Sequence, residues 1–248
     1  MRINPDLFSA EYDKPPYQGG RIEIYTKPGA DAFHGSGFFN FNGAAFNARD
    51  PFAEVRAPSQ TRRYGLQLGG PIVRRRAGFY LDFEKRDIND YATLNALILN
   101  NNFQPSTLLT NVFTPKRLLI GSARADWQLN STNVFVARYD FNSNRLDNQG
   151  IGGFDLPERA FNGKVTEHEL RFTETAVLSR SMFNEARLGL SLIRQNQQAI
   201  SNAPAITVLG AFNAGGATFQ ALARDERRIE IADNLSLTTH NHSLKFGA

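Results

Sequence analysis

Residues Arg117–Asn142 read RLLIGSARADWQLNSTNVFVARYDFN and contain two alternating segments joined by a short polar turn. In Arg117–Leu129 the apolar side chains of Leu119, Ala123, Ala125, Trp127 and Leu129 alternate with those of Ser122, Arg124, Asp126 and Gln128. Asn133–Asn142 repeats the pattern. Alternation with a period of two predicts β-strands with one apolar face. The intervening Asn-Ser-Thr predicts a tight turn, so this stretch indicates an antiparallel hairpin.

The same alternation recurs along most of the chain. A short strand is predicted at Arg21–Lys27, before a Lys-Pro-Gly turn. The longer predicted strands are Phe33–Asn42, Arg63–Gly70, Ala77–Arg86, Arg117–Leu129, Asn133–Asn142, Thr166–Leu178, Phe183–Arg194 and Glu226–Thr238. A ninth long strand is expected to begin after a turn at Thr239–Asn241. Two residues break the pattern, because Phe38 falls on a polar face and Glu174 on an apolar one.

The connections between these strands alternate four times between short and long. The long ones are 43–62, 87–116, 143–165 and 195–224. Most of the strands are about ten to thirteen residues long, whereas strands of soluble proteins usually have five or six. Long strands, short turns on one side and long loops on the other predict an all-β, antiparallel, up-and-down transmembrane β-barrel. The alternative is a soluble or surface-exposed β-sandwich with an adhesion or carbohydrate-binding role.

The composition argues against several classes of protein and of binding site. The 248 residues include no run of eighteen apolar side chains, which argues against a transmembrane helix. Cysteine is absent, which excludes a disulfide framework and a thiolate metal site. The net charge of +4 is dispersed, apart from short runs such as Arg74–Arg76, so we expect no nucleic-acid partner. Met1 is not followed by an apolar signal segment, so an envelope protein of this sequence is expected to be a fragment.

Candidate catalytic and metal-binding patterns are weak. His240-Asn241-His242 has a spacing that metal ligands use on a strand, but a solvated turn explains it better. His34 and His168 stand alone on strands and are expected to be polar or interfacial. No G-x-S-x-G motif occurs, and the glycines at 150–153 lack the context of a phosphate loop. We therefore expect no enzyme activity, no catalytic, cofactor-binding or metal-binding residues, and no cofactor.

Opposite charges recur two residues apart on the polar faces of the predicted strands. The pairs are Arg124 with Asp126, Arg138 with Asp140, and Glu169 with Arg171. The favoured interpretation is pairing with neighbouring strands, at about 0.2–1 kcal/mol for each contact. The alternative is that they contact a plug or line a path for a substrate.

Several passages resemble one family of proteins in the same order along the chain. They are NPDLFSAEYDKP, GGRIEIYTKPGADAFHGSGFFNFNGAAFNARDPF, RRYGLQLGGPIVRRRAGFYLDFEKR, RADWQLNSTNVFVARYDFNSNRLDNQGIGGFDLPERA and TETAVLSRSMFNEARLGL. Together they resemble TonB-dependent outer-membrane receptors, in particular the Oar-like group with a carboxypeptidase-regulatory-like domain. The resemblance covers nearly the whole chain.

The resemblance implies a plugged barrel of the 22-stranded type, present here only in part. It assigns 1–32 to the C-terminal end of a plug domain and 33–248 to the N-terminal part of the barrel, with eight complete strands and the start of a ninth. Arg21–Lys27 would end the plug and should not pair with Phe33–Asn42. The implied partners are outer-membrane lipid, TonB through a missing N-terminal part, and an unknown surface ligand bound mainly by the long loops and the top of the plug. The implied location is the bacterial outer membrane.

Overall fold

The computed structural model describes residues 2–4, 21–23, 31–51, 53, 55–217, 221–239 and 241–248. Within these ranges the regular structure is β-strand, apart from two short 3-10 segments, η1 (Ala44–Phe46) and η2 (Pro157–Arg159). Among the described residues no helix is long and apolar enough to cross a membrane. The all-β, antiparallel prediction is confirmed.

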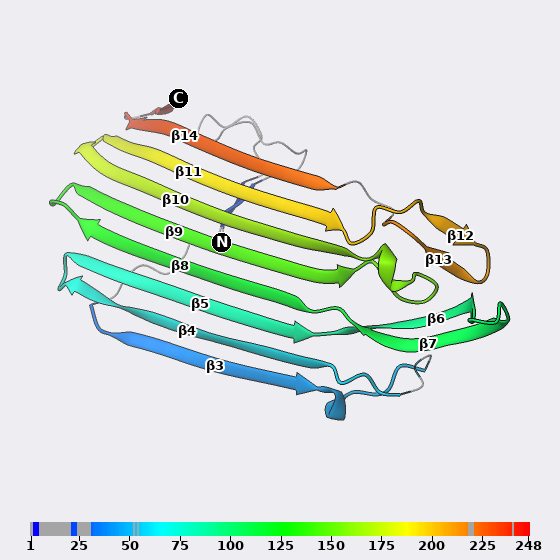
Figure 1. Ribbon diagram of the computed structural model, residues 1–248. Helices are drawn as coiled ribbons and strands as arrows, with labels where there is room; N and C mark the ends of the chain where they lie inside the picture. Colours follow the sequence, from blue (N-terminus) through cyan, green and yellow to red (C-terminus); the bar gives the residue numbers. More distant parts are fainter. Residues whose placement is uncertain are drawn as a thin grey trace.

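Nine strands form a single antiparallel sheet in which every strand pairs with its neighbour along the chain or across an inserted hairpin (Figure 1). In order they are β3 (His34–Gly43), β4 (Gln60–Val73), β5 (Ala77–Asn89), β8 (Lys116–Gln128), β9 (Asn133–Gln149), β10 (Phe161–Ser179), β11 (Met182–Ala199), β14 (Leu222–Thr238) and β15 (Ser243–Gly247). The predicted eight strands and the start of a ninth are therefore confirmed.

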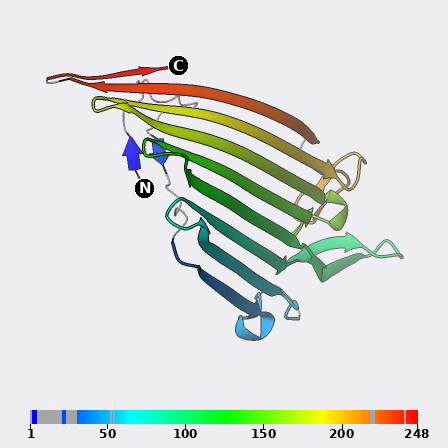
Figure 2. The ribbon, with the colours of Figure 1, turned by 90° about the vertical axis from the view of Figure 1, so that its left-hand side faces the viewer.

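The nine-stranded sheet is open. Its two edge strands, β3 and β15, each have one neighbour in the sheet. Figure 2 shows the sheet twisting along its length without meeting itself. Three two-stranded sheets accompany it: β1 (Arg2–Asn4) with β2 (Arg21–Glu23), β6 (Tyr91–Leu99) with β7 (Pro105–Phe113), and β12 (Ile206–Val208) with β13 (Phe212–Ala214).

The register separates apolar and polar side chains onto opposite faces of the sheet, because directly opposed residues point to the same side. One row across seven strands runs Leu68, Leu81, Ala123, Tyr139, Leu170, Leu190 and Ile229. The adjacent row runs Gln67, Asp82, Ser122, Asp140, Glu169, Ser191 and Arg228. We call the two sides the apolar face and the polar face.

The apolar face is uncovered. Ile229 and Ile231 on β14 are 72% and 77% exposed, and Trp127 and Phe83 are exposed as well. No second sheet packs against this face within the described ranges. The β-sandwich alternative is therefore wrong, since a sandwich buries its apolar faces between two sheets.

The two residues that broke the sequence pattern have local explanations. Phe38 lies on the polar face opposite Gly65, where a β-carbon would approach its ring to 2.6 Å, and the guanidinium of Arg63 lies 5.2 Å from the ring centre. Glu174 lies on the apolar face opposite Phe135, close to the short turns rather than in the middle of the strand. Position along the strand thus accounts for its charge.

Several predicted boundaries were too narrow. β9, predicted as Asn133–Asn142, continues to Gln149, and β10 starts at Phe161 rather than at residue 166. Pro71, which follows the predicted strand Arg63–Gly70, lies inside β4 next to an irregularity in its pairing with β5. The segment 87–116, expected to be a loop, contains the β6–β7 hairpin. The ladders continue beyond the apolar stretch because backbone hydrogen bonds do not require apolar side chains.

The predicted strand Arg21–Lys27 is described only at its start. Residues Arg21–Glu23 form β2, which pairs with β1 and not with β3, as expected. Residues 24–27, most of the following turn and His240 lie outside the described ranges. The assignment of 1–32 to a plug domain and 33–248 to a barrel stays a prediction.

Candidate functional site at the loop end of the sheet

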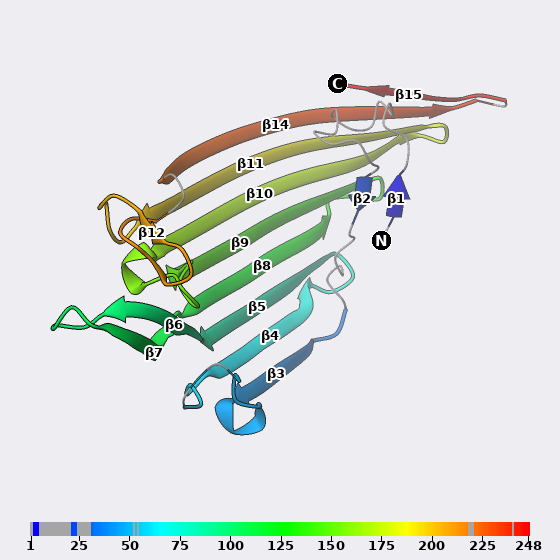
Figure 3. The same cartoon turned by 90° about the vertical axis from the view of Figure 1, so that its right-hand side faces the viewer.

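The short turns and the long connections lie at opposite ends of the nine-stranded sheet. In Figure 3 the β6–β7 and β12–β13 hairpins and the neighbouring connections lie together at one end of the long strands. All four long connections predicted to carry ligand contacts belong to this end, which we call the loop end. The opposite end, with turns such as 74–76 and 180–181, is the turn end.

Backbone hydrogen bonds tie three of these connections to one another. Asn95 of β6 donates to the carbonyl of Gly153 at 2.8 Å, and Gly153 donates back to Thr93 at 2.8 Å. Leu97, also on β6, donates to the carbonyl of Ala211 at 3.1 Å. The segments around 93–97, 153 and 211 are therefore held together by backbone groups rather than by side chains alone.

Two further contacts complete this assembly. Asn213 of β13 donates to the carbonyl of Phe154 at 2.8 Å and accepts from Leu156 at 2.9 Å. The connection between β3 and β4 is bound to the β6–β7 hairpin through the side chain of Asn111, which donates to the carbonyl of Val55 at 3.2 Å. All four long connections are thus joined to one another, and we call their described residues the loop platform: 44–51, 53, 55–59, 91–113, 150–160 and 200–216.

The platform has a small core of its own. Leu94 is fully buried and is the largest such side chain in the described residues. Ala96, Ala160 and Ala214 are also buried. Arg159 is only 6% exposed, and its Nε lies 2.9 Å from Oδ1 of Asp155. The sequence interpretation missed these residues.

Arg159 links two loops through its remaining donors and its neighbour. Its Nη1 donates to the carbonyl of Ala214 at 3.3 Å, and Glu158 accepts from the backbone N–H of Gly215 at 3.0 Å. A buried guanidinium needs such partners because an unpaired buried charge is very costly. The spacing of Asp155 and Arg159 around Pro157 was a sequence signal for this ion pair.

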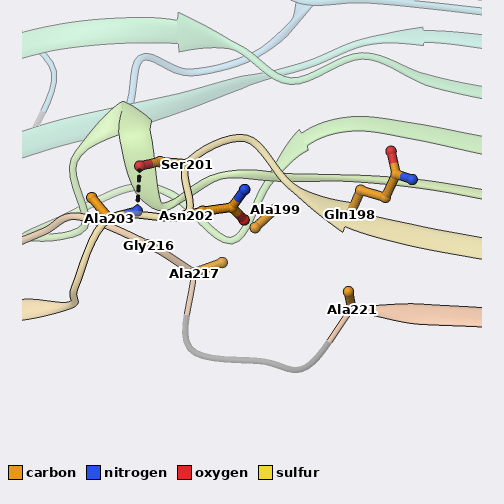
Figure 4. A pocket seen from close by; sticks show the side chains of 8 residues that line it. All are labelled: Gln198, Ala199, Ser201, Asn202, Ala203, Gly216, Ala217 and Ala221. Carbon is orange, nitrogen blue, oxygen red and sulfur yellow. Dashed lines mark hydrogen bonds between the residues drawn. The ribbon is translucent and has the colours of Figure 1, made fainter.

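The outer parts of the platform expose apolar side chains and a shallow cavity. Phe103 and Leu209, near the tips of the two hairpins, are strongly exposed. A cavity of about 470 Å³ lies among small side chains that include Ser201 and Ala203 (Figure 4). The hydroxyl of Ser201 accepts a hydrogen bond from the N–H of Ala203 at 3.2 Å. Its lining residues carry no charge, so this cavity suits neutral groups.

The charged pairs noted in the sequence are ion pairs along single strands. Nε of Arg138 lies 2.7 Å from Oδ2 of Asp140, Arg124 pairs with Asp126 at 2.5 Å, and Arg171 pairs with Glu169. The expected pairing between neighbouring strands is therefore wrong for Arg138 with Asp140 and for Glu169 with Arg171. Across the strands Arg138 lies directly between Arg124 and Arg171. The three arginines repel one another across the strands, and the carboxylate paired with each arginine reduces this repulsion.

The three histidines that the structure describes, His34, His168 and His242, form no cluster. Nδ1 of His168 lies 2.8 Å from the Tyr139 hydroxyl, and the centre of its ring lies 5.0 Å from that of Phe141 on the apolar face. His34 contacts the carbonyl of Ala32, and His242 lies in a hydrogen-bonded turn with Thr239. Among the described residues no three His, Asp or Glu side chains are grouped for a metal ion.

Comparison with protein families finds one match. The model described as an outer membrane beta barrel domain matches residues 25–117 and 91–248, which together span most of the chain. No curated protein and no solved structure matches the chain.

Proposed function

This chain belongs to the outer membrane beta barrel domain family and lies in the bacterial outer membrane, and we propose that it forms part of the wall of a TonB-dependent receptor. The receptor binds a ligand at the cell surface and imports it. Its role is binding and transport rather than catalysis.

The open sheet is the observation that carries this proposal. β3 and β15 each leave one side of the backbone without a neighbouring strand in the sheet. Lipid offers no partner for free N–H and C=O groups, so membrane sheets must close. Further strands closing this wall would make a barrel larger than nine strands. Barrels with about 22 strands have a lumen that a separate domain fills.

The polar face and the loop platform suit the same proposal. A closed wall would turn the arginine row of Arg124, Arg138 and Arg171 toward the lumen. Such a row suits either a water-filled channel or contact with a plug. The loop platform would lie at the cell surface, because long loops of these barrels are extracellular. Together with the ordered resemblance to Oar-like receptors, these features favour a plugged receptor over an open channel.

Coupling to TonB can be tested without knowing the ligand. The chain has no cysteine, so a single introduced cysteine is a unique label site in it. In the full-length protein, Arg138→Cys places the thiol on the polar face and Tyr139→Cys places it on the apolar face. Cells with and without TonB are treated with a water-soluble maleimide that does not cross membranes.

We expect slow labelling at position 138 that becomes faster when TonB is present and the inner membrane is energised, because movement of the plug opens the lumen. Position 139 should stay unlabelled in both strains. Fast labelling at 138 that is equal with and without TonB would indicate a passive channel. Labelling at 139 as fast as at 138 would contradict a lipid-facing apolar surface.

A further inference from the structure

Three basic residues lie side by side near the loop end of the apolar face. Arg117 on β8 is directly opposite Arg145 on β9, and Arg145 is directly opposite Lys164 on β10. Adjacent strands are about 4.8 Å apart, so the three side chains start within about 10 Å of one another. Like charges directly opposite each other destabilise a sheet. Nearby negative charge therefore stabilises the arrangement, and the number of carboxylates around it decides how much positive charge is left.

Four more basic residues extend this group on the same face. The seven residues, which we call the basic belt, are Arg62, Lys85, Arg117, Arg145, Lys164, Arg194 and Arg227. The same region of the face holds three carboxylates, Asp87, Asp147 and Asp225. Seven positive and three negative groups leave a net charge of about +4 there.

The carboxylates in the belt are shared or pair with a single cation. Asp87 lies 3.6 Å from Lys85 and 3.5 Å from Arg117. Asp225 lies 3.4 Å from Arg194 and 3.9 Å from Arg227.

The remaining members of the belt are exposed. Arg145 pairs with Asp147 at 2.9 Å but stays 63% exposed. Arg62 and Lys164 are exposed and contact no carboxylate in the described part of the chain. Positive groups of the belt thus remain accessible to an external anion.

The depth of the belt matches the boundary of a membrane. On β8, β9 and β10 the distance from Arg117, Arg145 and Lys164 to Trp127, Phe135 and Glu174 is ten residues in each case. At about 3.4 Å per residue and a strand tilt of about 40°, ten residues span about 26 Å. The apolar band of outer-membrane barrels is about 25 Å tall. The belt therefore lies where lipid head groups begin.

The charge at the two ends of this band differs. The ionisable groups of the apolar face near the turn end are Glu174 and Asp233, which are acidic, whereas the basic belt lies near the loop end. A positive surface attracts anionic lipids when it lies within a Debye length of their head groups. The membrane-facing surface is therefore acidic near the turn end and basic near the loop end. This difference in charge suits a membrane whose leaflet at the loop end is rich in phosphate.

We propose that the basic belt binds phosphate groups of lipids in the leaflet at the loop end. The ligand is a lipid head group with at least two phosphates, because one phosphate cannot reach three cations on adjacent strands equally. This inference rests on the outer-membrane location of the chain and not on transport or on TonB, so either proposal can fail alone.

The test uses the full-length protein folded in zwitterionic detergent micelles. The probe is a fluorescent glucosamine-disaccharide lipid with two phosphates, and its binding is measured by fluorescence anisotropy. The double variant Arg145→Gln with Lys164→Gln removes two exposed charges from the belt. We expect Kd to rise about 25-fold, since each Lys or Arg near an anionic surface contributes about a fivefold gain.

The matched control removes two charges elsewhere. Arg74→Gln with Arg180→Gln changes exposed turn residues at the turn end and gives the same net charge. Their distance from the belt exceeds the Debye length of about 8 Å, so Kd should change less than about twofold. Equal weakening in both double variants, or no change in the first, would overturn the proposal.

Two further arms separate the source of the phosphate. The same lipid without phosphates should not compete with the probe, and inorganic phosphate should compete only far above the lipid concentration. Equal competition by the dephosphorylated lipid would indicate purely apolar binding, and equal competition by inorganic phosphate would indicate a site for free anions. Lys164→Glu should weaken binding more than Lys164→Gln. Unchanged β-sheet circular dichroism shows that the variants fold.

Discussion

Replacing Leu190 with arginine introduces a charge in the middle of the apolar face, and we expect this to destabilise the full-length barrel by about 2–4 kcal/mol. Leu190 is directly opposite Leu170, which lies six residues from Lys164 and four from Glu174 along β10. With the rise and tilt used above, these separations place it about 16 Å and about 10 Å from the two charged levels. Leu190 is thus near the centre of the apolar band.

The adjacent residue provides a matched control. Ser191 lies between Glu169 and Arg228 on the polar face, so Ser191→Arg adds the same charge to an environment that already holds ion pairs. We expect a change of about 0–1 kcal/mol, as for exposed charges. The expected difference between the two variants is therefore about 1–4 kcal/mol, although they differ by one position in the chain.

The assay is folding of the full-length protein into phosphatidylcholine vesicles over a urea series. The folded fraction is read from heat-modifiable mobility on gels. A loss of 2–4 kcal/mol lowers the folding equilibrium constant about 30- to 900-fold. An equal loss in both variants, or a loss below about 1 kcal/mol for Leu190→Arg, would show that the two faces meet the same solvent and would refute the assignment of faces.

Three further outcomes are expected. Gly65→Ala should destabilise the sheet by about 1–3 kcal/mol in the same folding assay, because its β-carbon would lie 2.7 Å from a carbonyl oxygen of the next strand, whereas Gly163→Ala, whose nearest atom is 4.0 Å away, should be close to neutral. Arg159→Ala should speed proteolysis within 206–214 without changing the urea transition of the wall, since it removes a loop-to-loop link; equal rates in variant and wild type would contradict this. The isolated 248-residue chain should give no conductance steps in planar bilayers, because its two edge strands have unpaired backbone groups.

The wall of the molecule was predictable because its pattern is local. Alternation identified the strands, and short turns such as 130–132 set which strands pair. Strand ends were less predictable. Beyond Asn142 the apolar alternation fades, but β9 continues its hydrogen bonds with both neighbours up to residues 145–149. The alternation of apolar and polar side chains indicates which part of a strand lies in the membrane, whereas the backbone hydrogen bonds between strands continue beyond that part.

The loop platform was harder to predict because its contacts connect segments far apart in the sequence. Asn100-Asn101-Asn102 indicated a polar segment, and it is the turn of the β6–β7 hairpin, where the side chain of Asn100 accepts from the N–H groups of Asn102 and Gln104. The pattern around it did not show that Asn95 would bond to Gly153. Backbone contacts of this kind do not depend on the residue type, so the sequence does not indicate them.

The basic belt was harder to predict than the strands and easier to predict than the loop platform. Each of its residues was visible in the sequence, but its members are on seven different strands and come together only when the register is known. The charged residues on the polar face, which alternate regularly along their strands, were easier to recognise.

The hydrogen bonds that join the four long connections have a consequence for how a ligand would meet this surface. Separate loops would each lose conformational entropy on closing around a ligand, and that loss weakens binding. Here the contacts of Asn95, Leu97, Asn111 and Asn213 restrict the connections before any ligand arrives. The loop platform is therefore expected to receive a ligand as a preorganised surface, with little rearrangement of its backbone.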